Sequence, residues 1–174
     1  EPVLKEFSLA KADDYLEKGA LAWARKRNCV TCHTIGTYMQ IRPRLTPILG
    51  KPTTEIRELL TGTLADFKKA KLADLRKGTK PAEMIYTAAG LAEWDQHVTG
   101  KISDETESAL ELMFTIQEED GTWGPLGCWP PFESSAYQEA TVAAMAMTAA
   151  PGWLKKMDDK KLKSGVDNLK EYLR

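Results

Sequence analysis

Residues 9–33 read LAKADDYLEKGALAWARKRNCVTCH, a stretch that joins an amphipathic segment to two cysteines and a histidine. Apolar side chains recur three or four positions apart in its first part, which is the period of an α-helix with one buried face. We expect this helix over residues 9–26, with Ser8 as its N-cap. Its apolar face comprises Leu9, Ala12, Leu16, Ala20, Trp23 and Ala24.

The rest of the chain shows the same period, interrupted by stretches rich in proline and glycine. No stretch alternates apolar and polar side chains as a half-buried strand does, so we predict an all-α fold with no substantial sheet. Further helices are expected from residue 53 or 54 to 67, 81 to 100, 103 to 117, 134 or 135 to 150, and 159 to 173, which gives about six in all. We expect residues 28–52 and 120–132 to be loops and residues 68–80 to be a surface turn.

Size and charge limit the classes of function. The chain has 174 residues, 43% of them apolar and 28% charged, which suits one compact globular domain. Within it we separate a basic part, 1–80, from a helical part, 81–174. A net charge of -1 argues against nucleic acid as a partner, and no apolar run is long enough to span a bilayer.

The charge is unevenly distributed along the chain. Residues 1–80 carry 16 Lys or Arg against 9 Asp or Glu, and residues 81–154 carry 1 against 12. Such a dipole can orient docking to a charged partner. The same distribution also fits two halves that neutralise each other by packing together, and the sequence leaves both interpretations open.

The chemical signal is the CxxCH motif formed by Cys29, Cys32 and His33. This spacing is typical of one covalently attached c-type haem, with the cysteines bound to its vinyl groups and the histidine on its iron. A zinc site made from Cys29, Cys32, Cys128 and either His33 or His97 is an alternative. A thioredoxin-like dithiol is a third, although no predicted strand precedes the motif.

The sixth iron ligand would decide the function. Cys128 is the thiol left over after the motif, and an odd cysteine in a compartment where haem is attached needs an explanation. It lies in a loop rich in Pro, Gly and Trp, where Trp123, Trp129 and Phe132 could enclose a dry pocket. A Met, His97 or an open position are the other options. We also expect Arg42 and Pro43, which follow the motif, to contact the haem.

Two stretches resemble a known family. Residues 25–52 (RKRNCVTCHTIGTYMQIRPRLTPILGKP) are similar to the haem-binding start of monohaem cytochromes c of planctomycete-type bacteria. Residues 103–153 resemble their helical segment, which is like squalene cyclases and prenyltransferases. The residues that carry this second resemblance are Gln117, Asp120, Gly121, Trp123, Pro130, Pro131, Glu133, Ala150, Pro151 and Gly152. No Asp-rich cyclisation motif is present, so terpene chemistry is not implied.

Within this group, the chain resembles most the subunits of the anammox-type heterodimeric cytochrome complex NaxLS. The resemblance implies His33 as the proximal and Cys128 as the distal ligand, a very low potential, and binding of carbon monoxide or nitric oxide. It also implies a dimer with a related chain.

We therefore expect a gas-binding, sensing or redox cytochrome with a redox partner protein. The alternatives are a plain electron carrier with a Met or His ligand, and a haem enzyme of nitrogen-oxide or peroxide chemistry. Because the sequence offers only His97 and scattered carboxylates as catalytic acids or bases, we favour a role that is not enzymatic. Haem attachment predicts a periplasmic or equivalent compartment, with an anammoxosome as the version that the resemblance implies. Glu1 without a leader fits either a removed signal peptide or a chain shortened at its start.

Overall fold

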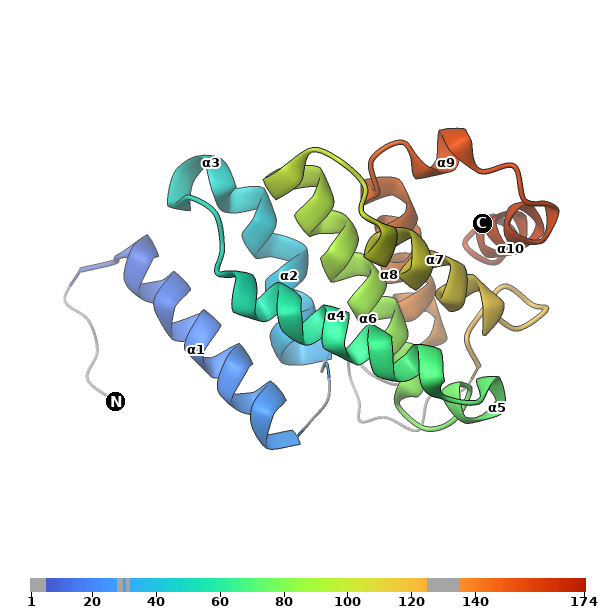
Figure 1. Ribbon diagram of the computed structural model, residues 1–174, viewed down its shortest axis with the longest axis horizontal. Coiled ribbons are helices and arrows are strands. Elements are labelled where there is room, and N and C mark those ends of the chain that lie inside the picture. Colours follow the sequence, from blue (N-terminus) through green and yellow to red (C-terminus); the bar gives the residue numbers. More distant parts are fainter. Residues whose placement is uncertain (1–5, 28–29, 31, 125–134) are drawn as a thin grey trace.

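The computed structural model describes residues 6–27, 30, 32–124 and 135–174, and the side chains of all of these except Cys32 and His33. Within these ranges the chain forms helices and no strand, so the all-α prediction is confirmed for the part described (Figure 1). Each of the six expected helices has a counterpart of similar bounds. These are α1 (Leu9–Arg27), α4 (Thr54–Lys69), α6 (Lys80–Trp94), α7 (Asp104–Thr115), α8 (Ala136–Ala149) and α10 (Lys160–Tyr172).

Short helices make the expected count of about six too low for the described residues. The predicted loop after the motif is mostly helical, and the predicted turn and the link before α10 each hold a further helix. The added elements are η1 (Cys32–Gly36), α2 (Thr37–Ile41), η2 (Arg42–Leu45), α3 (Thr46–Leu49), α5 (Leu72–Leu75) and α9 (Trp153–Lys156). η3 (Asp95–Thr99) directly continues α6 and completes the helix expected to end at Gly100. Pro43 and Pro47 lie in the first turns of η2 and α3, where a missing N–H costs nothing, so they begin helices rather than break them.

The centre of the molecule is α6, in which every residue from Pro81 to Trp94 is buried. A helix that is buried on every face must be covered on all sides. α2, α4, α7 and α8 pack around it. Gly90 allows the closest approach, because a Cβ there would lie 2.7 Å from Leu60 Cδ1 and 3.0 Å from Met39 Cβ. One apolar core therefore joins the basic and the acidic parts of the chain.

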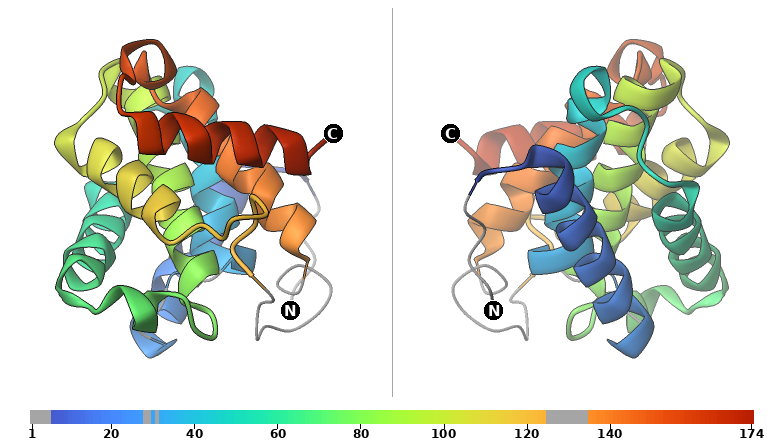
Figure 2. Two further views of the ribbon diagram at one scale, coloured as in Figure 1. Left: turned by 90° about the vertical axis from the view of Figure 1, so that its right-hand side faces the viewer. Right: turned by 90° about the vertical axis from the view of Figure 1, so that its left-hand side faces the viewer.

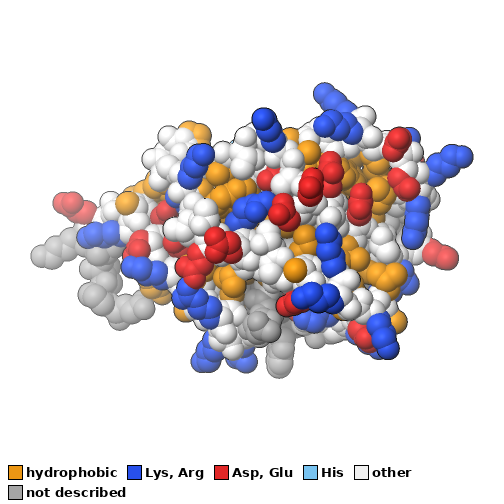
Figure 3. Space-filling view, viewed as in Figure 1, with side chains coloured by type: hydrophobic (Ala, Val, Ile, Leu, Met, Phe, Trp, Pro, Cys, Tyr) orange, Lys and Arg blue, Asp and Glu red, His pale blue; other side chains and the backbone are white. Residues whose placement is uncertain are grey.

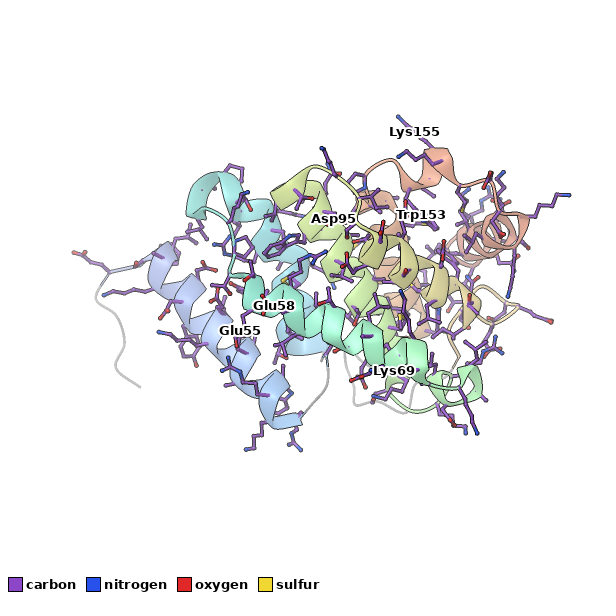
Figure 4. The ribbon with its side chains drawn as sticks, viewed as in Figure 1. Glu55, Glu58, Lys69, Asp95, Trp153 and Lys155 are labelled. Carbon is purple, nitrogen blue, oxygen red and sulfur yellow. The ribbon has the colours of Figure 1, made fainter. Side chains whose placement is uncertain are left out.

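Four helices begin at a serine or an aspartate whose side chain accepts a backbone N–H of the first turn. The hydroxyl of Ser103 accepts the backbone N–H of Thr106, and Asp159 accepts that of Leu162 in the same way. Ser8 and Ser135 make equivalent contacts at the starts of α1 and α8. Beside the start of α7, Asp95 Oδ2 accepts both the N–H and the hydroxyl of Ser103, at 2.6 and 2.7 Å (Figure 4). The predicted N-cap at Ser8 is therefore confirmed, and the helices expected to start at residues 103, 134 or 135, and 159 have Ser103, Ser135 and Asp159 as their N-caps.

α1 lies at one end of the molecule and α10 at the other (Figures 1 and 2). At the α10 end, Trp123 and Trp153 pack on Phe114 with ring centroids 6.1 and 5.9 Å away. At the other end α1 packs against η1 and α2, and an ion pair between Arg25 and Glu55 joins it to α4.

Candidate functional site

The backbone of the CxxCH motif joins α1 to η1. α1 ends at Arg27 and η1 begins at Cys32, so both Cys32 and His33 start a helix. Val30 and Ile35 on either side of them are buried, at 3% and 0% exposure. Val30 and Ile35, the described residues near Cys32 and His33, therefore lie in the core. Cys29 lies outside the described residues, as do the side chains of Cys32 and His33.

An apolar groove begins next to the motif. It runs between α1 on one side and η1, α2, η2 and α3 on the other, and its volume is about 360 Å³. Thr34, the residue directly after His33, is part of its wall. Most of the lining is apolar and comes from Leu9, Ala12, Leu16, Gly19, Ala20, Trp23, Tyr38, Ile41, Leu45 and Leu49. Both size and lining are ordinary for a small-molecule or cofactor site.

The groove leaves part of the predicted apolar face of α1 uncovered. Ala20 and Ala24, near the motif, are buried, but Leu16 is 57% exposed and Leu9 is 37% exposed. Ile41 on the opposite wall is 54% exposed. Our expectation that this face is buried along its whole length is therefore wrong for Leu9 and Leu16. Apolar side chains gathered on two facing walls are typical of a surface that another group covers.

A polar cluster lies among the apolar side chains that line the groove. Arg42 Nε lies 2.8 Å from both carboxylate oxygens of Asp13, and Arg42 Nη1 donates to the Gly50 carbonyl at 3.0 Å. The Tyr38 hydroxyl donates to Asp13 Oδ1 or Glu17 Oε2, both at 3.1 Å. We call Asp13, Glu17, Tyr38 and Arg42 the clasp, because it joins α1 to α2 and η2.

Burial raises the pKa of Tyr38 above its ordinary value, and the negative charges of Asp13 and Glu17 raise it further. The phenol therefore stays protonated and serves as a donor. Arg42 is the only cationic side chain among the described residues of the groove lining, and it is already paired.

The structure places the predicted site residues in different regions. Arg42 lines the groove, and Pro43 is buried beside it in η2. Trp123 does not lie at the groove: its Nε1 donates to the Met113 carbonyl at 2.8 Å, within the aromatic cluster at the other end. Cys128, Trp129 and Phe132 lie outside the described residues.

The alternative ligand His97 lies far from the motif. α2 and α6 run in the same direction, because Met39 is next to Gly90 and Arg44 pairs with Glu93. His33 is six residues before Met39 and His97 is seven after Gly90, so at 1.5 Å per residue their backbones are about 19 Å apart along the axis. Two histidine side chains on one iron do not span that distance. His97 Nε2 instead lies 3.3 Å from Glu93 Oε2.

The methionines are mainly core residues. Met39, Met84 and Met113 are fully buried, and Met147 is 5% exposed. Met84, six residues before Gly90, is level with His33 on α6, so by position it is the methionine that best fits an axial ligand. Its side chain is fully buried on the central helix and is not part of the groove lining.

The sequence did not predict Asp13, Glu17 and Tyr38 as residues of the candidate site. Asp13 and Glu17 are four residues apart on α1, and so lie on the same side of that helix. Their partners come from a segment that the sequence predicted to be a loop. In the sequence, the only indication of this cluster is that Asp13 and Glu17 directly follow the apolar positions Ala12 and Leu16 of the same helix.

The described residues contain neither a cluster of metal ligands nor a membrane-spanning helix. Among the described residues, no group of three or more His, Cys, Asp or Glu side chains could hold a metal ion. The zinc alternative needs Cys29 and Cys128, which lie outside them. In the described part of the chain, no helix has both the length and the apolar character needed to cross a bilayer.

No protein-family model matches the chain, and the comparisons with curated proteins and with solved structures gave no significant match.

Proposed function

We propose that the chain is a monohaem c-type cytochrome. The haem would be joined to Cys29 and Cys32, with His33 on its iron and its ring in the groove between α1 and α2. The observation that carries this proposal is the position of the groove, whose wall begins at the residue directly after His33. A c-type haem is tethered at its motif and cannot be placed elsewhere, so an apolar space beginning there is what the chemistry requires.

The groove suits a porphyrin in its chemistry. A largely apolar ring favours apolar walls, and burial of such surface contributes about 25 cal/mol per Å². Leu16 and Ile41, which are exposed to solvent from opposite walls, would be covered by the ring. Trp23 and Tyr38 add two aromatic surfaces. The haem would supply one-electron transfer and the binding of small gases at its iron.

The chain's own residues would hold and enclose the haem. The clasp fixes α1 beside α2, so the groove keeps two walls. Arg42 is buried in the groove lining and, as the only cationic side chain among its described residues, would be the group that meets a haem propionate. The backbone of η1 sets the position of His33 relative to these walls.

A pair of glycine variants tests the location of the haem. Gly19 in α1 lines the groove, and Gly62 in α4 does not; a Cβ at either position would meet no atom within 4 Å. Gly19→Phe should place a ring in the groove and lower the amount of haem bound, or change its Soret spectrum. Gly62→Phe should leave both unchanged. Equal haem content and identical spectra in the two variants would show that the haem lies elsewhere.

The proposal also covers the sixth ligand of the haem iron and the physiological role of the protein. We propose Cys128 as the distal ligand, a low potential and binding of a small gas such as nitric oxide or carbon monoxide. An extracytoplasmic location and pairing with a related cytochrome chain would follow from the family resemblance. The ferric spectrum of the wild type should have a thiolate-type low-spin pattern that Cys128→Ala abolishes. A spectrum unaffected by that substitution would favour the plain electron carrier with a methionine ligand.

A further inference from the structure

A second surface, at the opposite end of the molecule, carries concentrated positive charge. Residues 153–163 read WLKKMDDKKLK and include all of α9 and the start of α10. The five lysines of this stretch are exposed. We call them the lysine edge: Lys155, Lys156, Lys160, Lys161 and Lys163. Lys and Arg side chains project from this end in Figure 3.

Five lysines and two aspartates, Asp158 and Asp159, give residues 153–163 a net charge of +3. In the described ranges, no carboxylate forms an ion pair with any of the five, and Lys163 Nζ donates only to the Asp158 carbonyl at 3.3 Å. The other lysine-rich stretch, 68–80, is different. There Lys69, Lys77 and Lys80 pair with carboxylates at 2.9 to 3.2 Å.

The fold directs this edge outward. Trp153 is buried and stacked on Phe114, which fixes the base of α9. Gly152, at φ +72°, turns the chain so that Leu154 and Lys155 follow on the outside. Leu154 is 38% exposed, and Lys155 points away from the body in Figure 4. On α10, Val166 and Leu169 are buried against the body, which leaves the lysines on the solvent side.

The composition of the edge favours a lipid surface over a protein. Protein interfaces are enriched in Arg and depleted in Lys, and the lysine edge contains no Arg. Lysine is a point charge without the planar geometry that recognises a defined carboxylate. Four to eight basic residues on an amphipathic helix are typical of binding to anionic lipid headgroups. An exposed leucine at the tip adds apolar surface that a bilayer can accept.

We propose that the lysine edge binds the surface of a membrane that contains anionic lipid. This places the groove, at the α1 end, away from the bilayer and open to solvent or to a partner (Figure 1). The proposal does not depend on the haem, because none of its residues lies at the motif or the groove.

Sedimentation with lipid vesicles tests it. The protein should bind vesicles that mix phosphatidylglycerol with phosphatidylcholine and not vesicles of phosphatidylcholine alone, and added salt should release it. Lys160→Gln/Lys161→Gln removes two charges from the edge and should weaken binding by about 25-fold, or about fivefold for each lysine. Lys68→Gln/Lys71→Gln makes the same change on exposed residues elsewhere and should have little effect.

Three results would overturn the proposal. One is failure to bind anionic vesicles at low salt. A second is equal weakening in the two double variants, which would mean that only net charge matters. A third is binding to a soluble acidic polypeptide or to nucleic acid but not to vesicles, which would assign the edge to a macromolecular partner instead.

Discussion

Arg42 and Asp13 form a two-oxygen ion pair across the groove, with Arg42 Nε 2.8 Å from each carboxylate oxygen. Their side chains are 5% and 17% exposed, so the pair is shielded from solvent. Asp13 belongs to α1 and Arg42 to η2, 29 residues further along the chain. The pair therefore joins the two walls of the groove.

Replacing Asp13 by Ala should destabilise the protein strongly. The change leaves the buried Arg42 guanidinium without its anion, and loss of one partner of a buried pair costs about 3 kcal/mol. The neighbouring Asp14→Ala is a matched control on the same helix, since Asp14 and Lys18 form an exposed pair that contributes at most about 0.5 kcal/mol. Urea unfolding followed by circular dichroism measures both. Similar losses in the two variants would mean that the Asp13–Arg42 pair is not important for stability.

Glycine substitutions should separate close packing from helix propensity. In Gly90→Ala the new methyl would meet Leu60 Cδ1 and Met39 Cβ, so we expect a loss of about 1–3 kcal/mol from overpacking. In Gly62→Ala the methyl meets nothing within 4 Å, and the better helix propensity of Ala should add about 0.5–1 kcal/mol. Thermal unfolding compares them. A stabilising Gly90→Ala would contradict the close approach of α2 and α4 to α6.

Tyr38 should make stability depend on alkaline pH. Its pKa is higher in the folded state, mainly because of burial and then because of Asp13 and Glu17, so folding favours the protonated phenol. This contribution is complete below the unfolded pKa of about 10 and is lost as the pH rises above that value. The unfolding free energy of the wild type should therefore fall more steeply above about pH 10 than that of Tyr38→Phe. Parallel pH profiles would show that Tyr38 is not held in a site that favours its neutral form.

The long helices could be predicted because their sequences carry both period and caps. Ser103 and Asp159, for example, mark starts that the structure confirms. The helices after the motif could not be predicted, because Pro43 and Pro47 by residue type favour a loop. Whether a proline breaks or begins a helix depends on its place within the turn, and that place depends on packing against α6.

The candidate site was predictable only in part. The CxxCH motif marks its position, and Arg42, which we expected to contact the haem, lines the groove. Asp13 and Tyr38 are linked to Arg42 by contacts between residues far apart in the sequence, which no local pattern specifies. Trp123, expected in a pocket wall beside Cys128, is buried at the other end of the molecule from the groove, where its N–H donates to the Met113 carbonyl. Its expected role at Cys128 stays a prediction, because residues 125–134 lie outside the described part of the chain.

The intact mass of the denatured protein, produced together with a cytochrome c maturation system, tests the central claim most directly. We predict the mass of the polypeptide plus one haem, and the mass of the polypeptide alone for Cys29→Ala/Cys32→Ala. A colourless wild-type protein with the mass of the bare polypeptide would contradict the assignment of this chain as a cytochrome.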